Sequence, residues 1–453
     1  MQQPHGPSRP VATSTTAFGP PLRVRRCLAA AACALAGLLG LPAQVALAQA
    51  CDMGAATPDP RLHTLYIDGK GALLDPESRQ PVAGPEPLGA SAKARLKASK
   101  LPEQRYVQAM LDHFVALRAQ CPGLQLTVYV HGGLNTFGNT AGRARQFSRQ
   151  MLAEGHYPVF IGWDSSALPN YFDHLFRIRK GERKPLLAPL TSPLVLLEDL
   201  ARSLVRIPAA LYKEVHEGLT VLPAVTAEEE EDYNDRRGRL VTTGLTIVPA
   251  KAEDAKEAKG VGHSYWSVVN PLKLVGAPLV DGLGSGAWDS MLRRTDLVLS
   301  KSSAFEDEPP LEVSEYADTA ATRFLREWQD KVQSKGVVVN LIGHSMGAIV
   351  VTNILARHPL LRVDNVVFMG GAARIKDVAD VVVPWLASPL HAQARFYNLS
   401  LDPYNELAER VWLDSAPRGS LLNWIDGIFG EVNSFQDRTV GSWWNITRTA
   451  EDV

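Results

Sequence analysis

The chain has 453 residues, of which 45% are hydrophobic and 21% are charged. This composition excludes a collagen, a coiled coil and a disordered chain, and it predicts a globular protein with a large core. The 47 basic and 48 acidic residues nearly balance. A protein with so little net charge lacks the field that holds a polyanion, so we expect no nucleic-acid partner.

The first 50 residues contain four arginines and no acidic residue. Basic residues at 23–26 precede an uncharged run at 27–41, and small residues follow at 46–48. This order is typical of a secretory signal, so we predict a signal peptide over 1–48 and an exported, periplasmic or extracellular protein. An uncleaved membrane anchor is the alternative, because the whole uncharged stretch could just cross a bilayer.

Only Cys51 and Cys121 would remain after cleavage. Cys51 follows the small residues and is either a lipid-modified first residue or the partner of Cys121 in a disulfide. Two cysteines without a His/Cys cluster predict no zinc site, and we expect no metal. The glycine-rich run at 282–287 follows no clear strand, so we expect no dinucleotide and no other cofactor.

Short, β-branched and apolar runs alternate with helical patterns along the first part of the chain. In order, we predict a strand at 64–67, a helix at 103–119, a strand at 126–130, a polar helix at 140–154 and a strand at 158–163. Buried strands joined by helices are typical of a parallel sheet. The sequence therefore predicts an α/β fold.

The alternation stops after residue 163 and resumes near 337, with further strands predicted at 337–342, 363–369 and 395–399. We therefore divide the chain into a first core part at 49–166, a cap insertion at 167–335 and a second core part at 336–453. The insertion contains a helical region at 186–211, a solvated acidic run at 228–232 and an apolar region at 268–283. Lys273 and Asp281 in the last region argue against a membrane-spanning helix.

Residues 343–347 read Gly-His-Ser-Met-Gly and fit the G-x-S-x-G pattern of a nucleophile elbow. A predicted strand ends just before them and a helix at 348–356 follows, so Ser345 should lie in a tight turn at the carboxyl edge of the sheet. We expect glycine at 343 and 347 because a side chain there would collide with the neighbouring strand or helix. An ordinary glycine-rich turn is the alternative.

A serine that accepts an acyl group needs N–H donors for the oxyanion of its tetrahedral intermediate. We predict the backbone N–H of Met346 as one donor. The run 131–134, His-Gly-Gly-Leu, follows a predicted strand. There Gly133, with Leu134 as a further candidate, can turn its amide inward at little steric cost. We interpret His131 mainly as a residue that fixes this loop.

These motifs resemble those of the α/β-hydrolase superfamily, and more narrowly of its exported bacterial esterase-like and lipase-like members. The resemblance covers about residues 124–166 and 318–410. It is carried by HGG at 131–133, FIGWDS at 160–165 and GHSMG at 343–347. It implies an α/β-hydrolase fold, in which helices flank a mostly parallel sheet and a mainly helical cap is inserted.

The superfamily order places an acid after a later strand and a histidine after the acid. Asp402 follows a predicted strand and matches the place of the acid, with Glu406 in reserve. No histidine follows Asp402. His391 and His358 should each lie about 20 Å from Ser345, at roughly 3.3 Å per strand residue and 1.5 Å per helical residue.

The base is therefore unknown from the sequence. His344 is fixed by the elbow, which leaves His263 in the insertion and His131 as weak candidates. Because no final strand and helix are evident after Asp402, we expect that the chain as given ends before the element that carries the base. A catalytically silent binding protein on the same scaffold is the alternative.

With this resemblance, the sequence predicts a serine hydrolase that cleaves carboxylic esters through an acyl-enzyme. Ser345 would attack, Asp402 would orient a histidine, and the amides of Met346 and Gly133 would hold the oxyanion. The apolar cap favours a hydrophobic acyl group, as in a lipid ester, and peripheral contact with a membrane. Amidases and thioesterases use the same groups. A structural envelope protein, with no opening above Ser345, is a third possibility.

Overall fold

The computed structural model describes residues 58–84, 92–179, 182–184, 187–216, 270–301, 318–333, 336–401, 406, 419–430 and 432–446. All of them belong to one compact unit, Ala50–Val453. The predicted signal peptide, Cys51, the acidic run at 228–232, His263 and Asp402 lie outside the described residues.

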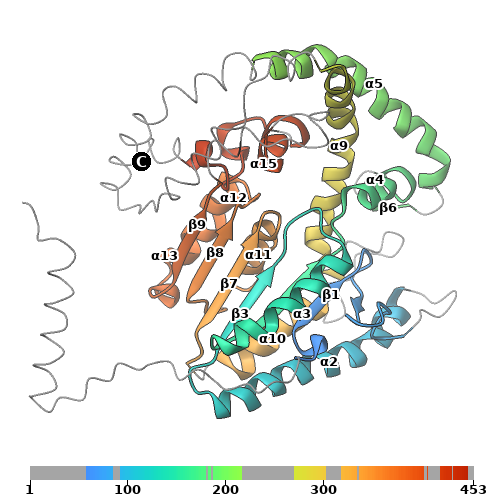
Figure 1. Ribbon diagram of the computed structural model, residues 1–453. Helices are drawn as coiled ribbons and strands as arrows, with labels where there is room; N and C mark the ends of the chain where they lie inside the picture. The colour runs from blue at the N-terminus through green and yellow to red at the C-terminus, as the bar shows by residue number, and fades with distance from the viewer. Residues whose placement is uncertain are drawn as a thin grey trace, which may run out of the picture. The chain divides into compact units, whose positions relative to one another are not determined.

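A seven-stranded sheet forms the centre of the fold, in the order β2-β1-β4-β3-β7-β8-β9 (Figure 1). Its strands are β1 (Thr64–Ile67), β2 (Leu73–Leu74), β3 (Gln125–Val130), β4 (His156–Trp163), β7 (Val339–His344), β8 (Asn365–Met369) and β9 (Arg395–Leu399). Only β2 runs antiparallel to its neighbour; the other neighbouring pairs are parallel. The predicted α/β class with a mostly parallel sheet is confirmed.

Helices connect the strands and flank the sheet (Figure 1). The helices are α2 (Ala92–Gln120), α3 (Phe137–Ala153), α4 (Ala167–Phe176), α5 (Leu187–His216), α9 (Pro271–Leu297), α10 (Ala320–Lys331), α11 (Gly347–Arg357), α12 (Ile375–Asp377), α13 (Val383–Ala387) and α15 (Leu421–Trp424). Short helical turns complete them: η1 (Pro60–Leu62), η5 (Val378–Val382), η6 (Pro389–His391), η8 (Ile425–Phe429) and η9 (Phe435–Asp437). Threonine side chains begin two of the helices. Thr136 accepts the N–H of Asn139 before α3, and Thr319 accepts that of Thr322 before α10.

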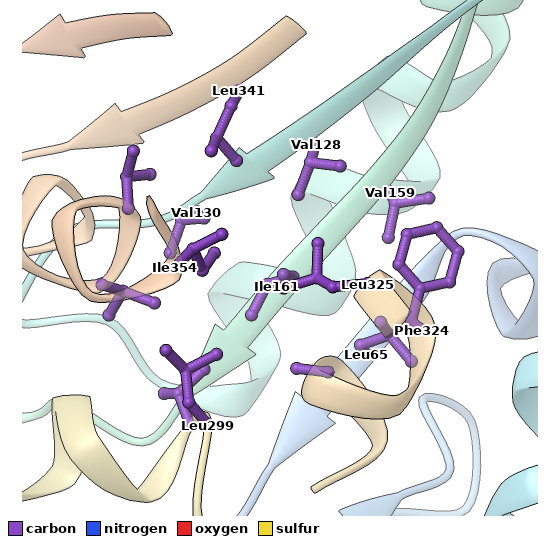
Figure 2. Packing of buried hydrophobic residues seen from close by; sticks show 14 of the residues in the cluster. Leu65, Val128, Val130, Val159, Ile161, Leu299, Phe324, Leu325, Leu341 and Ile354 are labelled. Atoms are coloured by element: carbon purple, nitrogen blue, oxygen red, sulfur yellow. The ribbon is translucent and has the colours of Figure 1, made fainter. Parts of the chain in front are cut away.

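The core lies between the central strands and the helices behind them. Figure 2 shows Val128, Val159 and Leu341 on three neighbouring strands, close to Phe324 and Leu325 of α10. All five side chains are buried, and each contributes roughly 1.5–3 kcal/mol by leaving water. Helix α10 lies within the segment 167–335 that was expected to form the cap. The core therefore resumes at α10, earlier than the predicted boundary at 335.

Helices α4, α5 and α9, which lie in the segment predicted as a cap, pack against one another. The closest approach is at Gly282 of α9, where any β-carbon would overlap the hydroxyl oxygen of Ser203 on α5. Lys273 and Asp281 of α9 are both buried. None of the described helices combines the length and the hydropathy that a bilayer span requires. Helix α9 is continuous with the core, because Met291 near its end is part of the main hydrophobic cluster.

Cys121 lies directly after α2 and is disulfide-bonded. Its partner is outside the described residues. A disulfide at this cysteine was one of the two alternatives that the sequence left open for Cys51, and it fits an oxidising compartment.

Candidate active site

Ser345 occupies a sharp turn between β7 and α11. Its φ angle is 50°, in the left-handed region that residues with a β-carbon rarely adopt. The glycines beside it permit the turn. A β-carbon at Gly343 would lie 2.7 Å from the amide nitrogen of Ala348, and one at Gly347 would overlap the carbonyl oxygen of Val130. As expected, a side chain at either position would collide with its surroundings. The atoms that it would meet belong to the main chain, which cannot rotate away.

Hydrogen bonds fix the main chain of Ser345 in this conformation. Its N–H donates to the carbonyl of Met369 at 2.9 Å, and its carbonyl accepts from Ala348 at 3.0 Å and Ala372 at 2.9 Å. The residue is partly exposed, and its hydroxyl makes no hydrogen bond to any described residue. A rigid turn thus presents a side chain that remains available.

The loop after β3 lies against this turn. A β-carbon at Gly132 would lie 2.8 Å from the β-carbon of Ser345, and one at Gly133 would lie 2.8 Å from the sulfur of Met346. The two motifs are separated by more than 200 residues in the sequence, yet the parallel pairing of β3 with β7 brings their carboxyl ends together. Glycine at 132 is therefore required by the closeness of the serine.

Some backbone N–H groups near the turn donate a hydrogen bond, whereas others have no acceptor among the described residues. Leu134 has a φ of 60°, and its N–H donates to the carbonyl of Ser165 at 3.0 Å. The N–H groups of Gly133 and Met346 donate to no acceptor among the described residues. Between the two candidates named for the second oxyanion donor, the geometry favours Gly133.

Asn135 holds the loop and was not singled out from the sequence. Its side-chain amide donates to the carbonyls of Gly132 at 2.9 Å and Gly133 at 3.1 Å. The hydroxyl of Ser165, after β4, also donates to the carbonyl of Gly132, at 3.2 Å. Because these hydrogen bonds hold the two carbonyl groups on one side of the loop, its N–H groups can point to the other side. An asparagine two residues after a Gly-Gly pair was the only available signal.

Both ring nitrogens of His131 take part in hydrogen bonds that hold the loop. Its Nε2 accepts the N–H of Trp163 at 2.9 Å, its Nδ1 donates to the carbonyl of Gly132 at 2.7 Å, and the ring stacks on the Trp163 indole. Burial lowers the pKa of His131 to about 4. Because both ring nitrogens are bonded, His131 is not placed to take a proton from Ser345. This geometry agrees with the structural interpretation of His131.

The low pKa values of His131 and His63 predict acid sensitivity. Burial also lowers the pKa of His63 to about 4, from an ordinary value of about 6.5. Between pH 6.5 and pH 4 the unfolded chain binds protons that the folded chain refuses. The free energy of unfolding should therefore fall in this window, by about 1.4 kcal/mol per pH unit for each histidine.

Urea denaturation at pH 7, 6, 5 and 4.5 measures this slope. His63→Asn keeps a donor for the carbonyl of Pro158, which His63 contacts at 2.9 Å, and removes one of the titrating groups. Its slope should be smaller than that of the unmodified chain by about 1.4 kcal/mol per pH unit. A free energy of unfolding that is constant from pH 6.5 to pH 4.5 would contradict the prediction.

His344 and His391 are also unsuited to act as the base. The Nδ1 of His344 is buried, and burial lowers the pKa of this ring; the nitrogen faces Gly132. His391 stacks on Trp385 and contacts the carbonyl of Pro359 at 2.9 Å through Nε2. Pro359 follows the far end of α11, about 16 Å along the helix from the elbow at 1.5 Å per residue.

The predicted acid, Asp402, lies outside the described residues, but its neighbour is placed. The N–H of Leu401 donates to the carbonyl of Gly441 at 3.3 Å, and Gly441 in turn donates to the carbonyl of Gly371 at 2.7 Å. These contacts bring the end of β9 to the loop that follows β8, next to Ala372 and the elbow. Leu401, the residue before Asp402 in the sequence, is therefore held at the carboxyl edge of the sheet.

Glu406, named as the reserve acid, is buried and accepts the N–H of Trp443 at 3.3 Å. Its backbone carbonyl accepts the N–H of Ser420 and the side-chain amide of Asn423. These bonds connect three segments of the C-terminal region. They give Glu406 a structural part in that region.

Within the described residues, no group of three or more His, Cys, Asp or Glu side chains is placed to hold a metal ion. Comparisons of the chain with family models, with curated proteins and with solved structures found no match. A proposal of function must therefore rest on the geometry of the elbow and its neighbouring loop.

Proposed function

We propose that the chain has an α/β-hydrolase fold and acts as a serine hydrolase on carboxylic esters. One observation carries the proposal: Ser345 has a positive φ at the end of a central parallel strand, and the Gly132-Gly133 loop contacts it. A positive φ at a residue other than glycine costs roughly 1–3 kcal/mol. An ordinary turn would therefore not keep a serine in this conformation. Such strain is typical of a presented nucleophile.

The chemistry follows from the groups around Ser345. Its hydroxyl oxygen attacks the ester carbonyl carbon while its proton passes to a base, and the N–H groups of Gly133 and Met346 stabilise the negative oxygen. The carbon–oxygen bond then breaks, and the alcohol leaves with the proton from the base. Water hydrolyses the acyl-serine by the reverse transfers. Asp402 is proposed to orient a histidine base that lies outside the described residues, for which His263 is the candidate in this sequence.

The cap favours an apolar acyl group. Met291 of α9 approaches within 3.0 Å of the position that a β-carbon at Gly133 would take, beside the side chain of Met346. Two flexible thioethers thus border the proposed oxyanion site, and such side chains adapt to hydrophobic ligands. We therefore propose a small hydrophobic or lipid ester as substrate and an exported location.

A fluorophosphonate that carries a reporter group tests the proposal, since it phosphonylates a serine only where base and oxyanion donors act together. We expect one label on the unmodified chain, located on Ser345 by peptide mass, and none on Ser345→Ala. Ser388→Ala, which alters a serine whose side chain caps no helix, should label normally. Labelling that persists in Ser345→Ala would contradict the proposal.

A non-catalytic binding protein is the second candidate. It is favoured by His131, His344 and His391, whose positions each exclude the part of a base for Ser345. A folded chain that binds acyl esters but takes no fluorophosphonate label and releases no product would support it. Loss of label in His263→Ala, with binding retained, would instead assign the base and support the enzyme.

A further inference from the structure

Helix α5 turns its polar face toward the rest of the protein and its apolar face outward, which is the reverse of the usual arrangement. The side toward α9 is polar: Asp199 and Ser203 are buried there, Arg206 forms an ion pair with Asp281 at 2.5 Å, and Arg202 donates to Ser285 at 3.1 Å. The side away from α9 is apolar. We call it the leucine face; its large residues are Leu190 (79% exposed), Leu194 (68%), Leu197 (61%), Leu204 (67%) and Val205 (79%).

The spacing shows that these residues form one continuous stripe. Leu190, Leu194, Leu197 and Leu204 are separated by four, three and seven positions, which places them on one side of a helix. Figure 1 shows α5 on the outer side of the cap, away from the sheet. A water-facing helix normally has the opposite arrangement, and an exposed apolar surface of this kind marks a site of interaction.

Basic residues precede the leucine face. The hairpin of β5 (Ile178–Arg179) and β6 (Glu182–Arg183) leads into α5. The segment 177–184, Arg-Ile-Arg-Lys-Gly-Glu-Arg-Lys, contains five basic residues and one acidic residue. The chain beyond residue 50 as a whole is mildly acidic, with 43 basic against 48 acidic residues. A local positive charge next to an apolar stripe matches an anionic lipid surface.

The contacts of α5 indicate that it lies on such a surface and does not cross it. Its inner side carries Asp199, Arg202 and Arg206, which are bonded to neighbouring helices, so only one side is suited to lipid. Neither α5 nor any other described helix meets the requirements of a membrane span. An interfacial helix buries its apolar face at the headgroup boundary and keeps its polar face elsewhere.

We propose that the leucine face of α5 docks the protein on an anionic lipid bilayer, and that the basic residues Arg177, Arg179, Arg183 and Lys184, which precede it in the chain, add charge attraction. This proposal rests on the proposed function, because a docked leucine face would hold the cap, and with it Ser345, beside lipid esters. Docking itself requires no catalysis. Ser345→Ala should therefore bind vesicles as the unmodified chain does, which separates a failure of docking from a failure of the proposed chemistry.

Flotation with vesicles tests the proposal, using the chain from Ala50 so that neither the leader nor an anchor within it contributes. We expect flotation with vesicles of phosphatidylethanolamine and phosphatidylglycerol, weaker flotation with pure phosphatidylcholine, and weakening by salt. Leu194→Asp/Leu204→Asp should reduce binding about tenfold or more. Arg179→Glu/Arg183→Glu should reduce only the part that depends on anionic lipid.

Leu101→Asp/Leu360→Asp is the matched control, because it also changes two exposed leucines, here on α2 and after α11. It should float like the unmodified chain. Circular dichroism and thermal unfolding confirm that each variant is folded. Equal flotation of the leucine-face variant and the control would overturn the proposal.

Two other occupants of the leucine face give distinct results. If a second copy covers it, the chain from Ala50 will sediment as a dimer, Leu194→Asp/Leu204→Asp will sediment as a monomer, and neither will float. If the chain's own segment 217–269 covers it, the unmodified chain will not float, whereas a chain that lacks this segment will. Either result would overturn docking on lipid.

Discussion

Gly347→Ala is expected to lower the free energy of unfolding by about 3 kcal/mol or more and to abolish fluorophosphonate labelling. Overpacking a core usually costs about 1–3 kcal/mol, because flexible side chains can shift. Here the new β-carbon would meet the carbonyl oxygen of Val130 and, at 2.9 Å, that of His131. Both belong to the main chain at the end of β3, which is bonded to a strand on each side. Relief requires movement of the elbow or of the loop that follows β3.

Gly142→Ala is the matched control for this substitution. Gly142 lies within α3, is exposed, and has no heavy atom within 4 Å of the position of a β-carbon. Alanine there should stabilise the protein by up to about 1 kcal/mol, since glycine is a poor helix former. Urea denaturation gives both changes on one scale. An unchanged midpoint and intact labelling in Gly347→Ala would show that the described contact at the elbow is wrong.

The sequence was sufficient for the parallel strands and the elbow because both depend on local patterns, whereas the short strands β2, β5 and β6 were not predicted. Buried parallel strands are short β-branched runs, and β9 was predicted at its observed bounds, Arg395–Leu399. The elbow followed from glycines at fixed positions around Ser345. The approach of Gly132 to Ser345 was expected from a general rule, that parallel strands place their carboxyl ends at one edge of a sheet.

Other features depend on partners that are distant in the sequence. The place of α10 in the core is decided by β-strands and α2, and its apolar residues alone do not distinguish core from cap. The bonds from Asn135 to the loop carbonyls depend on how that loop turns after β3. The reversed faces of α5 were not predicted for the same reason. The apolar content of the region was evident, but it is the contacts with α4 and α9 that determine that Asp199 and Ser203 face inward.

A second large effect is expected from Glu103→Ala, which should lower the free energy of unfolding by about 3–5 kcal/mol. The ammonium group of Lys301 donates to both carboxylate oxygens of Glu103, at 2.9 and 2.7 Å, and the side chains are 5% and 1% exposed. The pair joins α2 to the residues that follow α9. Removing the carboxylate takes this counter-charge away from a buried ammonium ion, and that is the costly half of a buried ion pair.

Replacing both partners separates the cost of the orphaned charge from the value of the pair. Glu103→Leu/Lys301→Met removes both charges and should recover most of the lost stability, because a buried pair and apolar groups of similar volume are often nearly equivalent.

Asp380→Ala is the exposed control. Asp380 and Lys376 are 59% and 51% exposed, and their ion pair should be worth less than about 1 kcal/mol. Urea midpoints for the variants measure all three effects. A double variant as unstable as Glu103→Ala would mean that the pair is valued for its hydrogen bonds, including the one from Leu73 to Glu103, and that charge burial contributes little.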